Sequence, residues 1–386
     1  MPFLCLDDFD AAARRHLPLP VYSYIAGAAE TSHSLAANRS AFAAHEFVPR
    51  VMVDITRRDM GVQLLGRRYD APFGIAPMGL AALSAYRGDI VLAQAAGHGN
   101  IPMVMSGSSL IRMEDVAAVN RDAWFQAYLP GDDAGIEALL QRVQQAHYQT
   151  LVITVDTAVA ANRENNVRAG FTIPVRPGLR LAWQGLSHPR WLFGTFVRTL
   201  LRHGMPHFEN SYATRGAPIL SSHVERDLSE RGHLHWRHFK MVRKLWPGQL
   251  VIKGVLDARD ARMAVDAGAD GIIVSNHGGR QLDGSVAPLR VLPQIVAACP
   301  EVPVMLDSGV RRGSDVLKAL ALGAKFVFVG RPFSFAAAVA GEGGVREAVD
   351  LLKREVSRNM ALLGVTALDQ LDPSFLVSHS PQGLSS

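Results

Sequence analysis

Eight short apolar runs, each ending in small or polar residues, recur along most of this chain and constrain its fold more than any other feature. The runs cover Phe73 to Gly79, Pro102 to Gly107, Trp124 to Leu129, Leu151 to Thr157, Leu250 to Val255, Gly271 to His277, Val304 to Gly309 and Phe326 to Arg331. A stretch rich in Ala and Leu follows most of them. Strands that alternate with helices predict a parallel sheet, and eight such units predict an α/β fold of the (β/α)8 TIM-barrel type.

The spacing of the runs indicates one domain with one long insertion. Most successive runs begin roughly 20 to 30 residues apart, which is the length of a βα unit. The exception is the gap of about 100 residues between Leu151 and Leu250. At 386 residues the chain could hold two average domains, but barrels with insertions reach this length as one. We therefore expect a single domain over residues 1–386, with a helical N-terminal segment near 7–45 and an insertion at 174–225.

The insertion at 174–225 interleaves arginine with aromatic residues. These are Arg176, Arg180, Arg190, Arg198 and Arg202, and Trp183, Trp191, Phe193, Phe196 and Phe208. Such a composition suits a membrane interface, where rings and apolar stems lie at headgroup depth and the cations meet anionic lipid. An active-site lid whose aromatics fold back onto the barrel is the alternative, and both interpretations stay open. A nucleic-acid surface is the least favoured reading.

Composition limits the remaining possibilities. The chain is 48% hydrophobic and 19% charged, as expected for a globular protein with a large core. A formal net charge of +5 and a pI near 9.4 indicate anionic partners without choosing among phosphate, carboxylate, lipid and nucleic acid. Cys5 and Cys299 form no motif for a disulfide framework or a metal site. No signal-peptide pattern or membrane-spanning run is present, so we expect a cytoplasmic protein.

Polar residues gather where the apolar runs end. They are Gly79, Ser106, Gln126, Tyr128, Thr154, Asp156, Lys253, Ser275, His277, Asp307, Arg311, Gly330 and Arg331. Catalytic groups of such barrels come from the carboxyl ends of the strands, and buried charges are costly unless they are paired or bound to an ion. Their convergence therefore predicts a polar cofactor. The glycines and arginines from Asp307 to Gly313 and at Gly330-Arg331 predict a phosphate site, which many barrels hold after the seventh and eighth strands.

His277 and Arg280 follow the sixth run in the segment Ser275-Asn-His-Gly-Gly-Arg-Gln281. A histidine can accept a proton near neutral pH, and an arginine can bind a carboxylate through two hydrogen bonds. A structural histidine in a basic loop is the alternative, and it would be favoured for a lone residue. The polar ends of the other seven runs favour an active site instead.

This segment resembles the signature of the FMN-dependent 2-hydroxy acid dehydrogenase and oxidase family, which includes glycolate oxidase, lactate oxidase, L-lactate dehydrogenase and (S)-mandelate dehydrogenase. The resemblance extends from Tyr22 to about Gly364. It implies an FMN cofactor, oxidation of an (S)-2-hydroxy acid to the 2-keto acid, and a homotetramer. His188 to Trp191 and Arg202 to Pro206 are similar to a membrane-attachment loop of membrane-linked members. That similarity implies peripheral attachment to the inner face of the cell membrane and a quinone or other non-oxygen acceptor.

The resemblance also implies cofactor-binding residues. These are Pro77, Met78, Gly79, Ser106, Gln126, Thr154, Lys253, Ser275, Asp307, Ser308, Gly309, Arg311, Gly330 and Arg331. Lys253 would act as a fixed cation beside the flavin N1 and the C2 oxygen, where it would stabilise the reduced ring. A salt bridge to a neighbouring carboxylate and a Schiff-base role are the alternatives for this lysine.

The catalytic residues implied are His277, Asp156, Tyr128 and Lys253, and the substrate-binding residues are Tyr24, Ser108, Arg163 and Arg280. His277 would take a proton, and Asp156 would orient its imidazole. Tyr128 would hydrogen-bond the substrate oxygen at which charge develops. The carboxylate would be bound by Arg280, with help from Tyr24 and Arg163.

Two departures from the oxidases of the family bear on the substrate. Ser108 stands where glycolate oxidase has tryptophan, and Gly79 stands where the oxidases carry alanine. Both predict room for a large side chain and a non-oxygen acceptor, so we expect an aromatic substrate such as (S)-mandelate. Quinone-linked oxidation of L-lactate and an oxygen-using oxidase are alternatives. An isomerase or aldolase that uses Lys253 as a Schiff base, and a non-catalytic membrane-associated barrel, are the rival classes.

Overall fold

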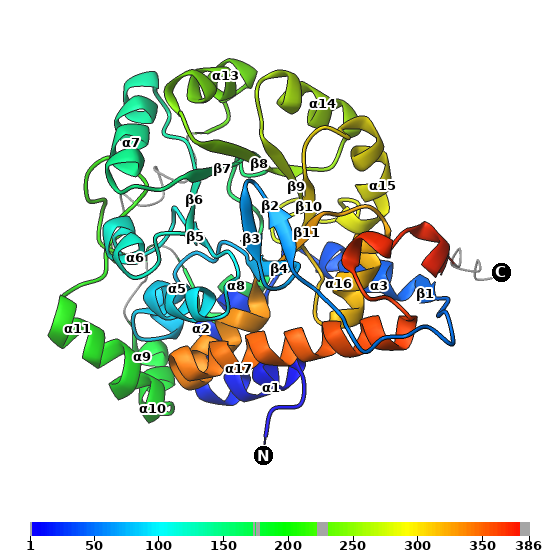
Figure 1. The fold of residues 1–386 in the computed structure, drawn as a ribbon. Coiled ribbons are helices and arrows are strands. Elements are labelled where there is room, and N and C mark those ends of the chain that lie inside the picture. The colour runs from blue at the N-terminus through cyan, green and yellow to red at the C-terminus, as the bar shows by residue number, and fades with distance from the viewer. Residues whose placement is uncertain (1, 173, 175–177, 222–230, 379–386) are drawn as a thin grey trace, which may run out of the picture.

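The computed structural model describes residues 2–172, 174, 178–221 and 231–378, and at its centre lies an eight-stranded parallel sheet (Figure 1). The strands are β4 (Phe73–Ile75), β5 (Val104–Ser106), β6 (Trp124–Ala127), β7 (Thr150–Thr154), β8 (Gln249–Val255), β9 (Gly271–Val274), β10 (Val304–Leu306) and β11 (Phe326–Val329). From β5 to β11 each strand pairs with the next one in sequence, and β11 pairs with β4. A parallel bridge between Ile75 and Met103 joins the two remaining edges. The predicted TIM barrel is confirmed, and each of the eight apolar runs matches one of its strands, with β7 and β8 starting one residue earlier than predicted.

The barrel interior is packed with side chains. Its buried cluster includes Val104, Trp124, Val152, Val251, Ile273, Met305, Phe326 and Phe328. The hairpin of β2 (Val62–Leu64) and β3 (Arg67–Tyr69) adds Val62, Leu64 and Tyr69 to the same cluster. Tyr69 packs 6.1 Å, between ring centroids, from Phe326 at the amino end of β11. The hairpin therefore covers the amino end of the barrel, which leaves the carboxyl end for a site.

A ring of helices surrounds the strands (Figure 1). These helices are α5 (Gly88–His98), α6 (Met113–Val119), α7 (Asp133–Gln145), α13 (Trp236–Leu245), α14 (Ala258–Asp266), α15 (Pro288–Ala298), α16 (Gly313–Ala321) and α17 (Arg331–Leu363). Each has a buried apolar face; in α7 it consists of Ile136, Leu139, Leu140 and Val143, at the three- and four-residue spacing of one helix face. The helical pattern after the last strand forms the second half of α17, beyond a break at Ala340 and Gly341.

The expected N-terminal helical segment forms three helices, α1 (Leu6–His16), α2 (Leu19–Ala26) and α3 (His33–Ala43). The chain then enters β1 (His45–Phe47), which pairs with β12 (Leu376–Ser378) after the short helices η2 (Leu368–Gln370) and η3 (Pro373–Phe375). The carboxylate of Asp283 accepts hydrogen bonds from the backbone N–H groups of Thr31 and Ser34, and Ala29 N donates to the Gly279 carbonyl. The segment that carries Tyr24 is thereby tied to the loop after β9.

The insertion after β7 contains a chain of short helices at the periphery (Figure 1). They are α9 (Leu179–Leu186), α10 (Pro189–Trp191), the π-helix η1 (Leu192–Val197) and α11 (Arg198–His203); α8 (Glu164–Ala169) precedes the insertion and packs against α2. The backbone N–H of Leu19, at the start of α2, donates to Oε1 of Gln184 on α9 at 3.1 Å. Arg176 and the end of the predicted segment, residues 222–225, lie outside the described residues.

The aromatic residues of the insertion divide into two sets. Trp191 is 7% exposed, donates its indole N–H to the Leu83 carbonyl at 2.8 Å and stacks on Phe196. Trp183 and Phe193, in contrast, are 68% and 64% exposed. We call the exposed apolar set of the insertion its outward side: Leu179, Trp183, Leu186, Phe193 and Leu201. In the described part of the chain, no helix is both long and apolar enough to cross a bilayer.

Candidate active site

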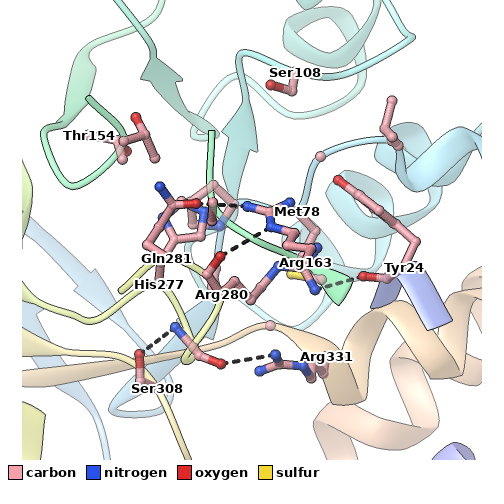
Figure 2. A pocket seen from close by; sticks show the side chains of 18 of the residues that line it. Tyr24, Met78, Ser108, Thr154, Arg163, His277, Arg280, Gln281, Ser308 and Arg331 are labelled. Atoms are coloured by element: carbon pink, nitrogen blue, oxygen red, sulfur yellow. Dashed lines mark hydrogen bonds between the residues drawn. The ribbon is translucent and has the colours of Figure 1, made fainter. Parts of the chain in front are cut away.

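A cavity of about 690 Å³ opens at the carboxyl ends of the barrel strands, and we call it the mouth cavity. Its lining includes most of the predicted site residues, namely Tyr24, Pro77, Met78, Gly79, Ser108, Tyr128, Thr154, Arg163, Lys253, His277, Arg280, Asp307, Ser308, Gly309, Arg311, Gly330 and Arg331. Figure 2 shows Arg163, His277, Arg280 and Gln281 gathered together, with Tyr24 nearby. Ser106, Asp156 and Ser275 are absent from the lining but contact residues that form it, and Gln126, also absent, is hydrogen-bonded to Ser106.

The His277 imidazole is held by Asp156. His277 Nδ1 lies 3.0 Å from Asp156 Oδ1, although 121 residues separate them in sequence. Burial lowers the pKa of His277 and outweighs the opposing effect of Asp156. Burial alone would raise the pKa of Asp156, but His277 and then Lys253 bring it below its usual value. The pair is therefore a neutral imidazole on an ionised carboxylate, and its other ring nitrogen, Nε2, can accept a proton.

Two glycines let the loop after β9 pack closely against its surroundings. Gly278 and Gly279 have φ angles of +69° and +73°, in the left-handed region that favours glycine. A Cβ atom on Gly279 would lie 2.6 Å from the backbone N of Leu35, and one on Gly278 would lie 2.7 Å from Nη1 of Arg331. His277 itself has φ of +58°, a conformation that is uncommon for a residue other than glycine. This strained turn aims the histidine and the arginine at one cavity.

Arg280 is anchored by backbone carbonyls. Its Nη1 donates to the carbonyls of Tyr24 at 2.6 Å and Gly27 at 3.0 Å, and its guanidinium lies 5.0 Å from the Tyr24 ring centroid. Arg163 Nε donates to the Arg280 carbonyl at 3.1 Å. Burial, followed by the nearby Arg163, lowers the pKa of Arg280 to about 10. Two cations held side by side in a cavity are arranged to bind a carboxylate.

Arg331, at the start of α17, forms a second cationic group together with Arg311. Its Nε donates to the Ile25 carbonyl at 3.0 Å, and its Nη2 donates to the Gly278 carbonyl at 2.9 Å. Burial, and then the neighbouring Arg280 and Arg311, hold the pKa of Arg331 well below its usual value. Burial also lowers the pKa of Arg311 to about 10. Within the described residues neither Arg280 nor Arg331 has a carboxylate ion-pair partner, so the cavity favours bound anions such as phosphate and carboxylate.

Lys253 forms a salt bridge with a neighbouring carboxylate, which is one of the alternatives that the sequence leaves open for this residue. Its Nζ lies 2.9 Å from Asp307 Oδ2 and donates to Ser275 Oγ at 2.8 Å. Burial opposes the charged form, but Asp307 and Asp156 together raise the pKa of Lys253. The side chain is therefore a permanent ammonium facing the mouth cavity. This disfavours a Schiff-base role, because the nucleophile in that chemistry is the neutral amine.

Ser106 and Gln126 form a buried network beside the cavity. Ser106 Oγ donates to Gln126 Oε1 at 3.2 Å, and the backbone N–H of Ser108 donates to Ser106 Oγ. Gln126 Nε2 is buried and has no acceptor among the described residues. A buried donor without a partner is costly, so this amide is suited to a bound acceptor.

The structure adds residues that sequence reasoning did not place in the site. Leu80, at the N-cap of α4 (Ala81–Ser84), joins Phe171 and Phe208 in a buried cluster that lines the cavity. Phe208 is buried, so the prediction that it belongs with the interface aromatics of the insertion is wrong. Arg231 also lines the cavity, and its guanidinium lies 4.7 Å from the ring centroid of Tyr128. No local sequence pattern marks Arg231 as a site residue.

No group of three or more His, Cys, Asp or Glu residues is placed to hold a metal ion in residues 2–172, 174, 178–221 and 231–378. The cavity instead offers one base, several arginines and one lysine. These groups can bind two anionic groups and accept a proton between them. That is what an anionic cofactor and a carboxylic acid substrate require.

Known dehydrogenases are similar to this chain over nearly its whole length. The (S)-mandelate dehydrogenase of Pseudomonas putida is 37% identical over 372 residues, covering 96% of this chain and 93% of that protein. The L-lactate dehydrogenase of Ectopseudomonas mendocina (strain ymp) is 38% identical over 381 residues, covering 96% of this chain and 97% of that protein. A crystal structure of (S)-mandelate dehydrogenase, described as a monotopic membrane protein, superposes with a TM-score of 0.91 at 36% identity and covers 98% of this chain and 100% of that one.

A family model described as FMN-dependent dehydrogenase matches residues 13–378. The matched region includes the barrel, α2 and the mouth cavity. The relatives described above are named as dehydrogenases of mandelate and L-lactate, which are both 2-hydroxy acids. The chain belongs to the FMN-dependent dehydrogenase family.

Proposed function

We propose that this enzyme oxidises an (S)-2-hydroxy acid with an aromatic side chain, such as (S)-mandelate, to the 2-keto acid. The observation that carries the proposal is the joining of three features in one cavity: the His277–Asp156 pair, cations for a carboxylate, and the apolar wall of Leu80, Phe171 and Phe208. A 2-hydroxy acid with a phenyl group presents a matching partner for each of them.

The substrate carboxylate is assigned to Arg280 and Arg163. The hydrogen bonds of Arg280 to the carbonyls of Tyr24 and Gly27 use only Nη1, so they leave its Nε–Nη2 edge for a ligand. A guanidinium edge binds a carboxylate through two parallel hydrogen bonds. Tyr24, which lines the same part of the cavity, is placed to add a third contact.

His277 is assigned as the base. Its Nε2 accepts the proton released by the substrate, and Asp156 stabilises the imidazolium that results. Tyr128 donates to the substrate oxygen at which negative charge develops. These roles hold whether the hydrogen on the α-carbon leaves as a proton or as a hydride.

The family cofactor FMN fits the remaining groups of the cavity. Arg331, Arg311 and Gly309 are placed to hold its phosphate, and the unpartnered Gln126 amide can donate to the ring system. Lys253 supplies a fixed positive charge that favours the anionic reduced ring. When bound, FMN supplies the two-electron acceptor of the reaction. Pro77, Met78, Gly79, Ser106, Thr154, Ser275, Asp307, Ser308 and Gly330 complete the proposed cofactor contacts.

The preference for an aromatic side chain rests on the space around Ser108. A phenyl ring placed against the wall of Phe171 and Phe208 would bury apolar area worth roughly 2 kcal/mol at about 25 cal/mol per Å². Gly79 borders the same space: a Cβ atom there would lie 3.1 Å from the Tyr24 hydroxyl and 3.2 Å from Ser108 Cβ. Alanine at position 79 would therefore press on both side chains. L-lactate, with only a methyl group, would leave the wall uncovered.

We also propose that the outward side of the insertion attaches the enzyme to the inner face of the cell membrane, where a quinone accepts the electrons. Exposed Leu179, Trp183 and Phe193 stand beside exposed arginines, a combination that suits an anionic bilayer surface. The similar structure described as a monotopic membrane protein supports this proposal. The homotetramer implied by the family resemblance stays a prediction.

Two measurements test the proposed function. Purified protein should carry stoichiometric non-covalent FMN, visible in its absorbance spectrum, and a folded protein that takes up no FMN would contradict the cofactor assignment. With an artificial electron acceptor, kcat/KM should be higher for (S)-mandelate than for L-lactate and glycolate. A clear preference for L-lactate would contradict the aromatic assignment and leave the family chemistry intact. A rate with oxygen that equals the rate with the artificial acceptor would contradict a non-oxygen acceptor.

A further inference from the structure

We propose that Arg231 is a positioning residue for the reaction: it stacks on Tyr128 and makes the phenol a better hydrogen-bond donor to the substrate oxygen. This inference rests on the role proposed above for Tyr128. It adds to the site a charged residue that follows the insertion, just before α13.

The contact between Arg231 and Tyr128 has the geometry of a cation–π interaction. The guanidinium carbon lies 4.7 Å from the ring centroid, within the roughly 6 Å over which a cation is attracted to an aromatic face. Arg231 is only 9% exposed, and both residues line the mouth cavity. Because little water reaches this pair, the attraction is screened less than at an exposed site.

A short turn fixes the backbone of Arg231. The Leu234 N–H donates to the Arg231 carbonyl at 3.1 Å, and the chain then enters α13. At the start of α13, the backbone N–H of His235 donates to Nδ1 of His238, and the Arg237 N–H donates to Nδ1 of His235. His238 is buried, so the helix start is a fixed base for the turn. The backbone at Arg231 is thus held by the turn and by the start of α13.

The electrostatics around Tyr128 show what a cation at this place changes. Burial raises the pKa of Tyr128, and the nearby Asp156 raises it further. Lys253 and Arg231 both oppose that rise. Asp156 is needed to hold His277, so its unfavourable effect on the phenol cannot be removed without losing the base. Arg231 offsets that effect from the face of the Tyr128 ring.

A phenol that is easier to polarise donates a stronger hydrogen bond to an oxygen as that oxygen gains negative charge. The benefit appears in the transition state more than in the bound substrate, so it should be seen in kcat more than in KM. No bond is formed or broken by Arg231, and the Tyr128 proton stays on the phenol oxygen. The effect expected for one desolvated cation–π contact is roughly tenfold in rate.

The test uses the full-length holoenzyme and its best 2-hydroxy acid substrate. Arg231→Met should reduce kcat roughly tenfold with little change in KM, and Arg231→Lys should recover part of the loss because the charge returns. In a Tyr128→Phe background, Arg231→Met should cause no further loss. Arg290→Met on α15 is the matched control, because it removes an exposed arginine that does not line the cavity and should leave kcat unchanged. Equal losses from Arg231→Met with and without the Tyr128 hydroxyl would overturn the proposal.

A ligand without a hydroxyl group separates positioning from a purely structural role. (S)-2-Phenylpropionate has the carboxylate and the phenyl ring but offers no oxygen to Tyr128. Its dissociation constant, measured by flavin absorbance titration, should be the same for the wild type and Arg231→Met. Weaker binding of this ligand, or a loss of FMN, would mean that Arg231 shapes the pocket and would overturn the proposal.

The activities of Tyr128→Phe and Arg231→Met distinguish an error in the role of Tyr128 from an error in the role of Arg231. If Tyr128→Phe alone retains full activity, the role of Tyr128 in the proposed function is wrong and the inference about Arg231 falls with it. If Tyr128→Phe is slow while Arg231→Met is normal, only the inference about Arg231 is wrong.

Discussion

Arginines of the mouth cavity and arginines of the insertion stand in opposite surroundings. Arg280 and Arg331 are held by backbone carbonyls, and burial lowers the pKa of both. Arg180 and Arg190, on the insertion, are exposed and lie among exposed apolar side chains. A buried, fixed guanidinium suits a small anion enclosed in a cavity, whereas an exposed one beside tryptophan and phenylalanine suits an extended anionic surface. We therefore propose that the same residue type serves two kinds of partner, and that burial distinguishes them.

This comparison predicts that the two regions can be damaged independently. Changes in the mouth cavity should alter turnover and leave membrane attachment as it is. Changes on the outward side of the insertion should do the reverse.

The largest effect is expected at His277. His277→Ala removes the proton acceptor and should reduce kcat by about 10²–10⁴-fold, the range for a lost acid–base group. Steady-state kinetics with an artificial acceptor measure the loss, while FMN absorbance and vesicle binding should match the wild type. Near-normal turnover would remove His277 from the mechanism.

A smaller loss is expected for Arg280→Lys. A lysine can reach the carbonyls of Tyr24 and Gly27 or the substrate, but a single ammonium cannot replace both edges of the guanidinium. We expect kcat/KM to fall by about 10- to 100-fold, since a charge-assisted hydrogen bond contributes roughly 1.5–3 kcal/mol. Arg121→Lys, at an exposed position, is the control and should have no effect. Unchanged kcat and KM in Arg280→Lys would place the carboxylate elsewhere.

Substitutions on the outward side of the insertion should weaken membrane binding and leave turnover unchanged. Replacing Leu179, Trp183, Phe193 and Leu201 with serine removes most of the outward side while Trp191 keeps its contacts with Leu83 and Phe196. Sedimentation with vesicles that contain anionic lipid should fall about tenfold or more, because each inserted apolar side chain contributes roughly 1–3 kcal/mol. Turnover with a soluble acceptor should not change. Unaltered sedimentation together with a lower kcat would identify the segment as a lid.

The last effect is on stability and is expected at Asp89, in the first turn of α5, outside both regions. Both carboxylate oxygens are buried without a hydrogen-bond partner among the described residues, and burial raises the pKa of Asp89 to about 7, although the nearby Ser109 hydroxyl opposes this. A carboxyl whose pKa rises on folding holds its proton more tightly in the folded state. Its contribution to stability is therefore complete below about pH 4 and is lost as the pH rises through about 7.

Asp89→Asn should match the wild type in stability near pH 4 and exceed it at pH 7. The difference should grow by up to ~1.4 kcal/mol per pH unit between these values. Denaturation midpoints of both proteins across this range measure it, with Asp369→Asn at an exposed position as the control. A difference that does not depend on pH would show that Asp89 is ionised in the folded protein. Turnover and vesicle binding should be unaffected.

The sequence by itself determined the barrel and much of the mouth cavity. A strand buried on both faces needs a continuous apolar run. A polar residue at the end of that run therefore lies at the carboxyl end of the barrel, where the active sites of such barrels form. His277, Lys253 and Arg331 were predicted in this way before any contact between them was known. The pairing of His277 with Asp156 came from the family resemblance, since local patterns do not reveal a contact across 121 residues.

Only the tertiary structure decided which side of the insertion faces the barrel and which residues return from it to the site. Trp183 and Trp191 are equally apolar and close in sequence, yet one is exposed and the other is buried beneath the Leu83 carbonyl. Phe208 and Arg231 reach the cavity because the chain folds back after α11, and no periodicity in the sequence records that path. The physical reason is that burial of a side chain in a long insertion depends on what another part of the chain presents to it, whereas burial in a barrel strand is already expressed in the strand's own run of apolar residues.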